Sequence, residues 1–313
     1  MQNKNIVITG AAGYLGSMLS TKLVQAGYNV TAVDLLKYEK NSLAHLFFYK
    51  NFKFLKIDVT KDKNIKTILK NQDIIIPLAG LVGAPLCDKF KKKAVETNFG
   101  AIQKLIKYSK KKQKIIYPTT NSGYGVGIKG KFCDENSPLN PISLYGETKV
   151  KAEKIIFERK NSICFRLATV FGYSYRMRTD LLVNNFVKQA FDKKHLEIFE
   201  PNFRRNYIHV QDVTDAFIFA IKNFSILKNN IYNLGLSEAN ITKINLARKI
   251  KKYLKKTKIS IITSRSDPDK RDYFVSNNKI EKKGFKAKIS LDKGIKELIN
   301  VFQHCNIKFI NNY

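Results

Sequence analysis

The chain has 313 residues, of which 57 are Lys or Arg and 25 are Asp or Glu, and its formal net charge is +32. This length corresponds to one large domain or two modest ones. A hydrophobic fraction of 44%, with 12% aromatic residues, indicates a packed core and excludes a disordered basic tail protein.

The positive charge first suggests a nucleic-acid partner or an anionic membrane surface. However, only nine of the basic residues are Arg and the other 48 are Lys, whereas proteins that read phosphates and bases rely on the planar fork of Arg. Abundant Lys, Ile and Asn together are typical of A/T-rich codons, so the excess charge needs no partner. We therefore expect no nucleic-acid partner, and keep a basic-surface binder as an alternative.

Several other classes are excluded by the absence of their motifs. No apolar run approaches the roughly 18 residues of a membrane span, and the first residues enter a strand pattern without a signal-peptide core. The four cysteines, Cys87, Cys133, Cys164 and Cys305, form no CxxC and no Cys/His motif at metal-ligand spacing. We expect no membrane anchor, no metal and four reduced thiols in a cytoplasmic protein.

Short β-branched runs alternate with amphipathic stretches over the first two-thirds of the chain, a pattern typical of a parallel α/β sheet. The expected strands are Asn5 to Thr9, Asn29 to Asp34, Phe52 to Ile57, Ile74 to Pro77, Lys114 to Pro118 and Ser162 to Leu167. The expected helices between them are 14–26, 62–70, 94–111 and 142–160. The predicted fold class is α/β, with a Rossmann-type doubly wound parallel sheet.

After Gly172 the alternation is weaker. The pattern there predicts a strand over 204–210 and helices over 213–224, 240–256 and 290–304. We expect a large α/β domain formed by residues 1–172 with about 204–236. A smaller α/β C-terminal domain comprises about 173–203 with 237–313, and a cleft separates the two.

A GxxGxxG motif follows the first strand and opens a helix, with its glycines at Gly10, Gly13 and Gly16. Glycine permits a sharp turn, close backbone approach to a pyrophosphate and tight helix–strand packing, and the helix N-terminus offers N–H groups to the anion. Asp34 ends the second strand, where a carboxylate can accept hydrogen bonds from a ribose and repels a 2′-phosphate. The motif therefore predicts NAD(H) rather than NADP(H), although Lys37 lies nearby.

Two later strand ends support a dinucleotide site. Asp58 and Val59 follow the third strand, where the carboxylate can hold the edge of an adenine or, alternatively, cap a helix. Leu78, Ala79 and Gly80 end the fourth strand, and their small side chains leave room for a dinucleotide to cross the sheet.

The most specific chemical signal is a YxxxK motif, Tyr145 and Lys149, on a predicted helix. Residues four apart share one helix face, so the phenol and the ammonium can contact the same ligand. A tyrosine has a reference pKa near 10, and a nearby cation favours the phenolate. We predict that Tyr145 is a general base for a sugar hydroxyl that NAD oxidises, and that Thr120, after the fifth strand, hydrogen-bonds the reacting oxygen.

The segments TGAAGYLG, TTNSGYG, YGETK and RNYIHVQDV resemble those of the extended short-chain dehydrogenase/reductases that modify nucleotide sugars. A closer resemblance, to the NAD-dependent GDP-heptose 4-dehydrogenases of capsule biosynthesis, rests on LAGLVGAPLCDK, NSGYGVG, SPLNPISLYG, FRLATVFG, RMRTDLLVNNF and DPDKRDYFVSNNKIE (267–281). The resemblance implies oxidation of the C4 hydroxyl of a GDP-linked heptose to a ketone. It also implies that the larger domain binds NAD and the smaller one the nucleotide sugar.

The resemblance assigns roles to individual positions. On the cofactor it places Gly10, Gly13, Tyr14, Leu15, Gly16, Asp34, Asp58, Val59, Leu78, Ala79 and Gly80. Tyr145, Lys149 and Thr120 become the catalytic residues. The substrate contacts are Asn121, Ser122, Arg176, Arg178, Asn184, Arg205 and Arg271, with Arg205 on the diphosphate. A homodimer through the helices near 94–111 and 142–160 is implied as well.

One departure from the resemblance bears on the reaction type. In the 4,6-dehydratases of this family an Asp/Glu pair follows the catalytic Thr, whereas this chain has Asn121 and Ser122, which cannot act as a carboxylate acid or base. Dehydratase activity is therefore disfavoured, and nothing in the sequence places the nearby Glu147 or Asp134 at the elimination site. Two outcomes of C4 oxidation stay open, a 4-dehydrogenase and a 4-epimerase. A non-catalytic NAD sensor is a further alternative, although such relatives commonly lose the tyrosine or the glycine loop.

Overall fold

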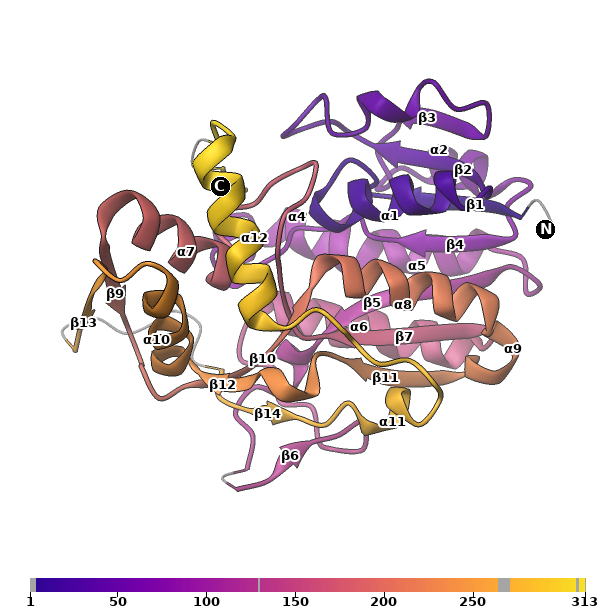
Figure 1. Ribbon diagram of the computed structural model, residues 1–313. Helices are drawn as coiled ribbons and strands as arrows, with labels where there is room; N and C mark the ends of the chain where they lie inside the picture. Colours follow the sequence, from indigo (N-terminus) through magenta and orange to yellow (C-terminus); the bar gives the residue numbers. More distant parts are fainter. Residues whose placement is uncertain (1–3, 129, 264–270, 308–309, 313) are drawn as a thin grey trace.

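The computed structural model describes residues 4–128, 130–263, 271–307 and 310–312. Seven parallel strands form the central sheet in the order β11-β7-β5-β4-β1-β2-β3 (Figure 1). The strands are β1 (Asn5–Thr9), β2 (Asn29–Asp34), β3 (Phe52–Lys56), β4 (Ile74–Pro77), β5 (Lys114–Thr120), β7 (Ser162–Leu167) and β11 (Asn230–Leu234). The six strands predicted for this sheet are confirmed, and β11 adds a seventh at its edge.

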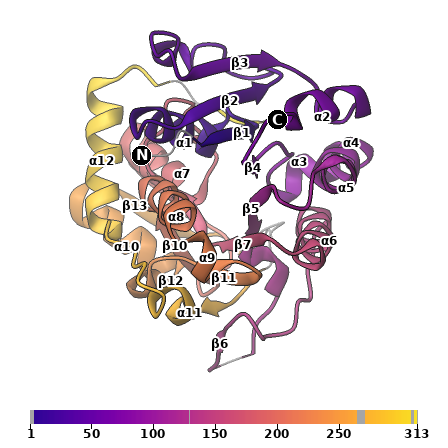
Figure 2. The same cartoon turned by 90° about the vertical axis from the view of Figure 1, so that its right-hand side faces the viewer.

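Helices cover both faces of this sheet (Figure 2). One face packs against α1 (Tyr14–Gln25), α8 (Val210–Lys222) and α9 (Phe224–Leu227), and the other against α2 (Asp62–Leu69), α5 (Ala101–Tyr108) and α6 (Leu144–Arg159). Side chains alternate along a strand, so Ile6 and Ile8 pack toward α1 while Val7 packs toward the opposite helices. The doubly wound α/β prediction is therefore confirmed.

Most of the remaining helices and strands lie in the C-terminal half of the chain. Strand β10 (Arg204–His209) pairs with β8 (Thr169–Phe171) and β12 (Asn240–Thr242), outside the large sheet. Two further strand pairs are β9 (His195–Ile198) with β13 (Lys258–Ile261), and β6 (Phe132–Cys133) with β14 (Phe274–Val275). The other helices are α3 (Ala84–Lys89), α4 (Lys91–Val95), α7 (Leu182–Lys193), α10 (Lys243–Tyr253), α11 (Asn278–Glu281) and α12 (Leu291–His304). Short 3-10 turns lie at Ala44–Leu46, Asn121–Tyr124 and Ser237–Ala239.

Three predicted helix boundaries are wrong. The helix expected over 94–111 begins at Lys91 and ends at Tyr108, and a π-helical segment, Glu96–Gly100, joins α4 to α5. The helix expected from 240 begins only at Lys243, because Thr242 ends β12 and its side chain caps the helix by accepting from the Asn245 N–H. The helix expected from 213 begins at Val210, directly after β10.

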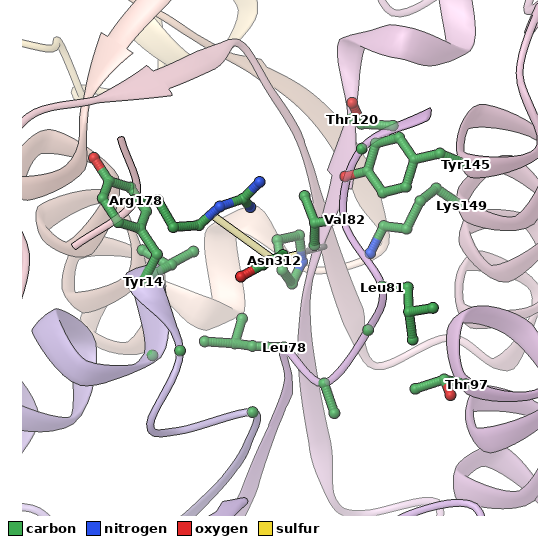
Figure 3. Close-up of a pocket in the computed structure, with 18 of the residues that line it drawn as sticks. Tyr14, Leu78, Leu81, Val82, Thr97, Thr120, Tyr145, Lys149, Arg178 and Asn312 are labelled. Atoms are coloured by element: carbon green, nitrogen blue, oxygen red, sulfur yellow. The ribbon is translucent and has the colours of Figure 1, made fainter. Parts of the chain in front are cut away.

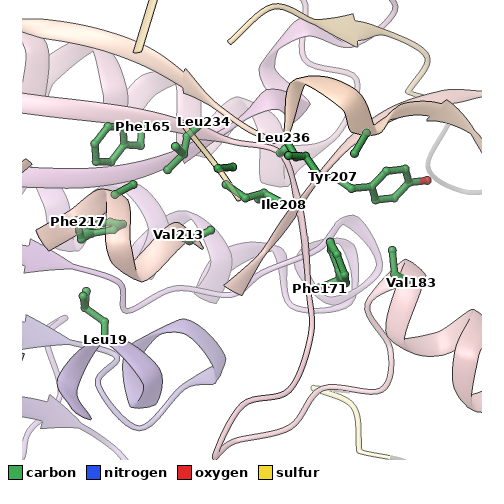
Figure 4. Close-up of a cluster of buried hydrophobic side chains, with 14 of the residues drawn as sticks. Leu19, Phe165, Phe171, Val183, Tyr207, Ile208, Val213, Phe217, Leu234 and Leu236 are labelled. Atoms are coloured by element: carbon green, nitrogen blue, oxygen red, sulfur yellow. The ribbon is translucent and has the colours of Figure 1, made fainter. Parts of the chain in front are cut away.

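A single hydrophobic core connects the two predicted domains (Figure 4). It extends from Leu19 on α1 through Phe165 and Phe217 to Val183 on α7, and all four side chains are fully buried. The division into two domains stays a prediction. None of the helices in the described part of the chain is both long enough and apolar enough to cross a bilayer.

Candidate active site

A cavity of about 820 Å³ opens at the carboxyl ends of the central strands, where the strand order reverses between β1 and β4. Every residue predicted to contact the cofactor lines it, and so do Thr120, Tyr145 and Lys149. Five of the predicted substrate contacts also line it: Ser122, Arg176, Arg178, Arg205 and Arg271. Residues far apart in the sequence thus share one concave surface.

The glycine loop after β1 can accommodate no side chain at two positions. Gly10 has φ +70°, and a Cβ atom on it would lie 2.6 Å from the backbone N of Ala79. A Cβ atom on Gly16 would lie 2.2 Å from the Gly10 carbonyl oxygen. The close backbone packing leaves a smooth cradle at the start of α1, which fits the pyrophosphate of a dinucleotide.

Carboxylates at the end of β2 and just after β3 line one end of the cavity. Asp34 accepts hydrogen bonds from the backbone N–H groups of Ala12 (3.0 Å) and Leu36 (2.9 Å), which hold it beside the glycine loop. Asp58 accepts from both the backbone N–H and the hydroxyl of Thr60. Burial opposes ionisation of Asp58, but these hydrogen bonds and nearby lysines outweigh it and lower the carboxyl pKa. Both groups are therefore poised to accept hydrogen bonds from an adenosine.

Figure 3 shows Tyr145 and Lys149 projecting from α6, with Thr120 beside the Tyr145 ring and Tyr14 and Arg178 on the opposite side of the cavity. Ser143 caps this helix by accepting from the Gly146 N–H, which places Tyr145 in the first turn.

The two side chains of the YxxxK motif carry strongly shifted pKa values. Burial raises the pKa of Tyr145 to about 12, although Arg271, a hydrogen bond with Thr120, and Arg178 act in the opposite direction. Burial also lowers the pKa of Lys149 to about 7, and its Nζ lies 4.0 Å from the centre of the Tyr117 ring. The sequence suggested Lys149 as the cation that favours the phenolate. In the structure Arg271 and Arg178 are cations that act to lower the Tyr145 pKa.

The loop after β4 is held by a residue that the sequence did not single out. The side chain of Asn98, in the π-helical segment, accepts from the Leu81 N–H (2.8 Å) and donates to the Leu81 carbonyl (2.9 Å). It also donates to the Thr148 hydroxyl on α6 at 3.4 Å. Asn98 thereby ties the loop after β4 to α6, and no motif marks it in the sequence.

Basic side chains line the far end of the cavity. Arg176 is 2% exposed, its guanidinium lies 4.9 Å from the Tyr38 ring centre, and it donates to the Asn312 side chain at 2.5 Å. Arg178 forms a two-pronged ion pair with Asp180, so its charge is already balanced. Further positive side chains at this end come from other segments.

Arg205 and Lys243 add charge from β10 and α10. Arg205 donates to the carbonyl of Arg204 at 2.9 Å, and Lys243 donates to the carbonyl of Phe199 at 2.9 Å. Both side chains are 2% exposed and line the cavity. Lys243 was not predicted, because nothing in the sequence separates it from the other lysines of this Lys-rich chain. Other lining residues without an earlier assignment include Tyr38, Lys61, Lys92, Lys93, Thr97 and Tyr273.

Two predicted substrate contacts are corrected, because the structure places neither in the cavity. Asn184 is fully buried; it accepts from the Gly172 N–H and donates to the Arg178 carbonyl, so it supports the loop that carries Arg178. Asn121 is 1% exposed, and its amide has no hydrogen-bond partner among the described residues. Residues 267–270, the start of one segment on which the family resemblance rests, lie outside the described residues.

Comparisons with known proteins agree with this geometry. Residues 6–235 match the NAD dependent epimerase/dehydratase family. An uncharacterized protein of Methanocaldococcus jannaschii is 27% identical over 96% of this chain and 97% of its own length.

Two solved structures share the fold. A dTDP-glucose 4,6-dehydratase from Bacillus anthracis, in complex with NAD, has a TM-score of 0.84 at 21% identity, over 97% of both chains. A UDP-glucuronic acid 4-epimerase from Bacillus cereus, in complex with UDP-glucuronic acid and NAD, has a TM-score of 0.85 at 22% identity, over 96% of this chain and 99% of that one. With most of its length matched, this chain belongs to the NAD-dependent epimerase/dehydratase family, enzymes of the extended short-chain dehydrogenase/reductase type.

Proposed function

We propose that the enzyme oxidises the C4 hydroxyl of a nucleotide-linked sugar to a ketone, with a GDP-linked heptose as the favoured substrate and surface polysaccharide synthesis as the role. The observation that carries this proposal is the single cavity that joins the glycine cradle, the Tyr145–Thr120 pair and the basic side chains. A diphosphate-linked sugar matches that order of groups, since its anion can lie against the basic end while its sugar reaches Tyr145.

The proposed cofactor residues occupy the half of the cavity nearest β1 and β2. Gly10 to Gly16 would hold the pyrophosphate, Asp34 the adenosine ribose and Asp58 the adenine. NAD, when bound there, supplies the oxidising power for the reaction. The carboxylate of Asp34 disfavours a 2′-phosphate and supports NAD over NADP.

Tyr145 is the proposed base that accepts the proton of the C4 hydroxyl. Thr120 lies beside Tyr145, and its hydroxyl can donate a hydrogen bond to the Tyr145 oxygen or to the C4 oxygen of the substrate. Such a hydrogen bond stabilises the negative charge that develops as the substrate loses its proton. Lys149 lies on the same face of α6, and orients Tyr145 while contacting the nicotinamide ribose. Burial lowers the pKa of Lys149 to about 7, so the amino group can exchange a proton near physiological pH.

The proposed diphosphate site is the basic end of the cavity. Arg176, Arg205 and Lys243 reach it from three separate segments and are almost completely buried. Like charges gathered at one end of a cavity repel one another, and an anionic diphosphate bound among these side chains would lessen that repulsion. Arg178, already paired with Asp180, and Arg271 would complete this end.

An elimination reaction finds little support in the residues next to Tyr145. Ser122 stands where a dehydratase has a carboxylate, and Asn121 is buried outside the cavity. Glu147 and Asp134, the acids nearest in sequence, are also not among the described residues that line it. The site therefore favours oxidation at C4 over removal of water across C5 and C6.

The test is to mix the NAD-containing enzyme with GDP-sugars and a 2-oxo acid that can reoxidise the cofactor, and to identify the product by mass spectrometry and NMR. A 4-keto sugar nucleotide is expected. Recovery of a C4 epimer without ketone would instead support a 4-epimerase, an outcome kept open by the epimerase fold relative. Tyr145→Phe should abolish turnover while the protein still retains NAD.

The same proposal carries expectations about partners and setting. GDP should bind more tightly than UDP in calorimetry, and the protein should sediment as a homodimer through α4–α5 and α6. The four cysteines are free thiols, three of them buried, which supports a reducing, cytoplasmic setting. Limited proteolysis between residues 172 and 204 would test the proposed division into an NAD-binding and a sugar-binding domain.

A further inference from the structure

Arg271 has a contact that a residue holding only a diphosphate does not need. Its Nη1 donates to the hydroxyl of Ser122, which lies two residues after Thr120. The same nitrogen is 3.4 Å from the Tyr273 hydroxyl. Arg271 thus reaches past the basic end of the cavity to the hydroxyl groups beside Tyr145.

The two residues that follow Arg271 are held in place by other segments. Asp272 accepts three hydrogen bonds from Arg204, one from its backbone N–H and two from its guanidinium. Tyr273 is 2% exposed and its ring packs edge-on against Tyr124. Because Asp272 and Tyr273 are fixed in this way, the backbone from which Arg271 reaches Ser122 is well defined.

The hydroxyl groups between Arg271 and Tyr145 can be assigned donors and acceptors. A guanidinium only donates, so the Ser122 oxygen accepts from Arg271. The cation also repels the positive end of the hydroxyl dipole, so the Ser122 hydrogen turns away, toward the Thr120 Oγ1 at 2.8 Å.

The hydroxyl of Thr120 can then act only as a hydrogen-bond donor. Its Oγ1 accepts from the Ser122 hydroxyl and also from the Ser122 backbone N–H at 3.1 Å, which uses both lone pairs. The remaining O–H can only donate, and Thr120 lies beside the Tyr145 ring and acts to lower the Tyr145 pKa. Ser122 and Thr120 are 1% and 7% exposed, so little water competes with this arrangement.

We propose that Arg271 is a positioning residue for Tyr145, acting through Ser122, whose hydroxyl it orients so that Thr120 donates its O–H to the Tyr145 oxygen. This inference rests on the proposed function only in naming Tyr145 as the base. A donated hydrogen bond stabilises the phenolate relative to the phenol, because the phenolate is the stronger acceptor. Ser122, in the position of a dehydratase carboxylate, thus has a separate role in C4 oxidation.

Other groups around Tyr145 contribute to its ionisation and must be held constant. Cys87 on α3 raises the Tyr145 pKa, and Arg178 before α7 lowers it. Tyr117 on β5 and Lys149 on α6 complete the surroundings. None of these four is changed in the variants that test the proposal.

The test measures the Tyr145 pKa directly, by NMR of carbon-13-labelled tyrosine in the protein with added NAD and no sugar, with Tyr145→Phe identifying the signal. Arg271→Gln should raise that pKa by about one unit, Ser122→Ala should raise it by a smaller amount, and Arg271→Lys should restore part of the difference. Arg248→Gln, which removes a charge from α10 outside the cavity, is the matched control and should leave the signal unchanged. Thermal melting checks that each variant is folded.

Activity gives a second, independent readout once a substrate is found. The acid limb of the pH–kcat profile should move to higher pH in Arg271→Gln and in Ser122→Ala, with kcat at neutral pH falling about tenfold. An increase in KM alone, with the Tyr145 signal unmoved in both variants, would overturn the proposal and leave Arg271 as a substrate contact only. If the signal moves but no sugar is oxidised by the unaltered protein, the positioning role holds and the proposed function fails.

Discussion

The two ends of the cavity are built by different means. The cofactor end is mostly backbone from the continuous β1–α1 unit, where Gly10 and Gly16 leave no room for a side chain. The other end, the proposed sugar end, is formed by side chains such as Arg205, Lys243 and Arg271, which come from separate segments. A backbone site recognises what the whole family shares, whereas side chains can be exchanged one at a time. Substrate choice should therefore be decided at the sugar end.

Helix α6, which carries Tyr145 and Lys149, lies between these ends. The largest expected effect concerns the ion pair that holds this helix against the sheet. Glu153 on α6 and Arg166 on β7 form a buried ion pair at 2.7 Å, with side-chain exposures of 4% and 5%. Glu153→Ala leaves the buried Arg166 guanidinium without its carboxylate partner, so the free energy of unfolding should fall by about 3–5 kcal/mol in urea denaturation.

The control is an exposed pair on α7, Lys188 with Asp192, which is four residues along the same helix. Asp192→Ala should cost at most about 0.5 kcal/mol. Equal losses in the two variants would mean that the Glu153 pair does not anchor α6.

Gly16→Ala tests the claim that the cofactor end is made of backbone. The added Cβ would meet the Gly10 carbonyl oxygen at 2.2 Å, and neither backbone segment can move without separating β1 from α1. We expect a loss of about 3 kcal/mol in stability or NAD affinity, read by melting and by calorimetric titration with NAD. Gly100→Ala is the matched control, since its nearest neighbour would be 3.8 Å away, and it should bind NAD normally.

Lys149→Met separates catalysis from stability in α6. The pKa of about 7 in the folded protein lies below the ordinary 10.5, so the unfolded chain binds more protons between these values and stability rises with pH across that window. Below about pH 7 both states carry the charge, and the cost of burying it is fully present. The Lys149→Met variant should lose activity, yet its free energy of unfolding should be about 2 kcal/mol higher at pH 6.

That gain should shrink as the pH rises toward 10.5, where the lysine is neutral in both states. Urea denaturation at several pH values measures it. A gain independent of pH would show that better packing of Met, rather than the removed charge, is responsible.

The smallest expected effect probes one side chain of the sugar end. Arg205→Gln should weaken GDP binding about tenfold, corresponding to the loss of one charge-assisted contact, while NAD affinity stays unchanged. Arg248→Gln is the matched control, because Arg248 lies on α10 and does not line the cavity. If both variants also lowered the affinity for NAD, the two ends of the cavity would not bind their ligands independently.

Motifs that are compact in the sequence were predictable. The Gly10–Gly16 loop and the Tyr145–Lys149 pair each lie within one turn or one helix, so spacing alone carries their geometry. The strands of the large sheet were predictable for the same reason, because their β-branched runs are buried on both faces.

Residues whose role depends on distant partners were not predictable. Asn98 acts on the cofactor loop only because a π-helical segment turns it toward Leu81, and Lys243 reaches the cavity only because β12 ends at Thr242. Asn184 shows the opposite error. The sequence predicted a substrate contact there, because the residue is polar and near two arginines, but its side chain is buried and holds the loop that carries Arg178.

By itself, the sequence determined the parallel α/β fold, the glycine cradle and the Tyr145–Lys149 face of a helix. The charge of +32 on a Lys-rich chain did not indicate which cations matter. Only the tertiary structure decided that Lys149 is buried with its pKa lowered to about 7 and that Arg271 reaches the hydroxyl groups beside Tyr145. The reason is physical: dihedral and packing preferences act between neighbours in the chain, whereas burial and Coulomb interactions depend on segments that only folding brings together.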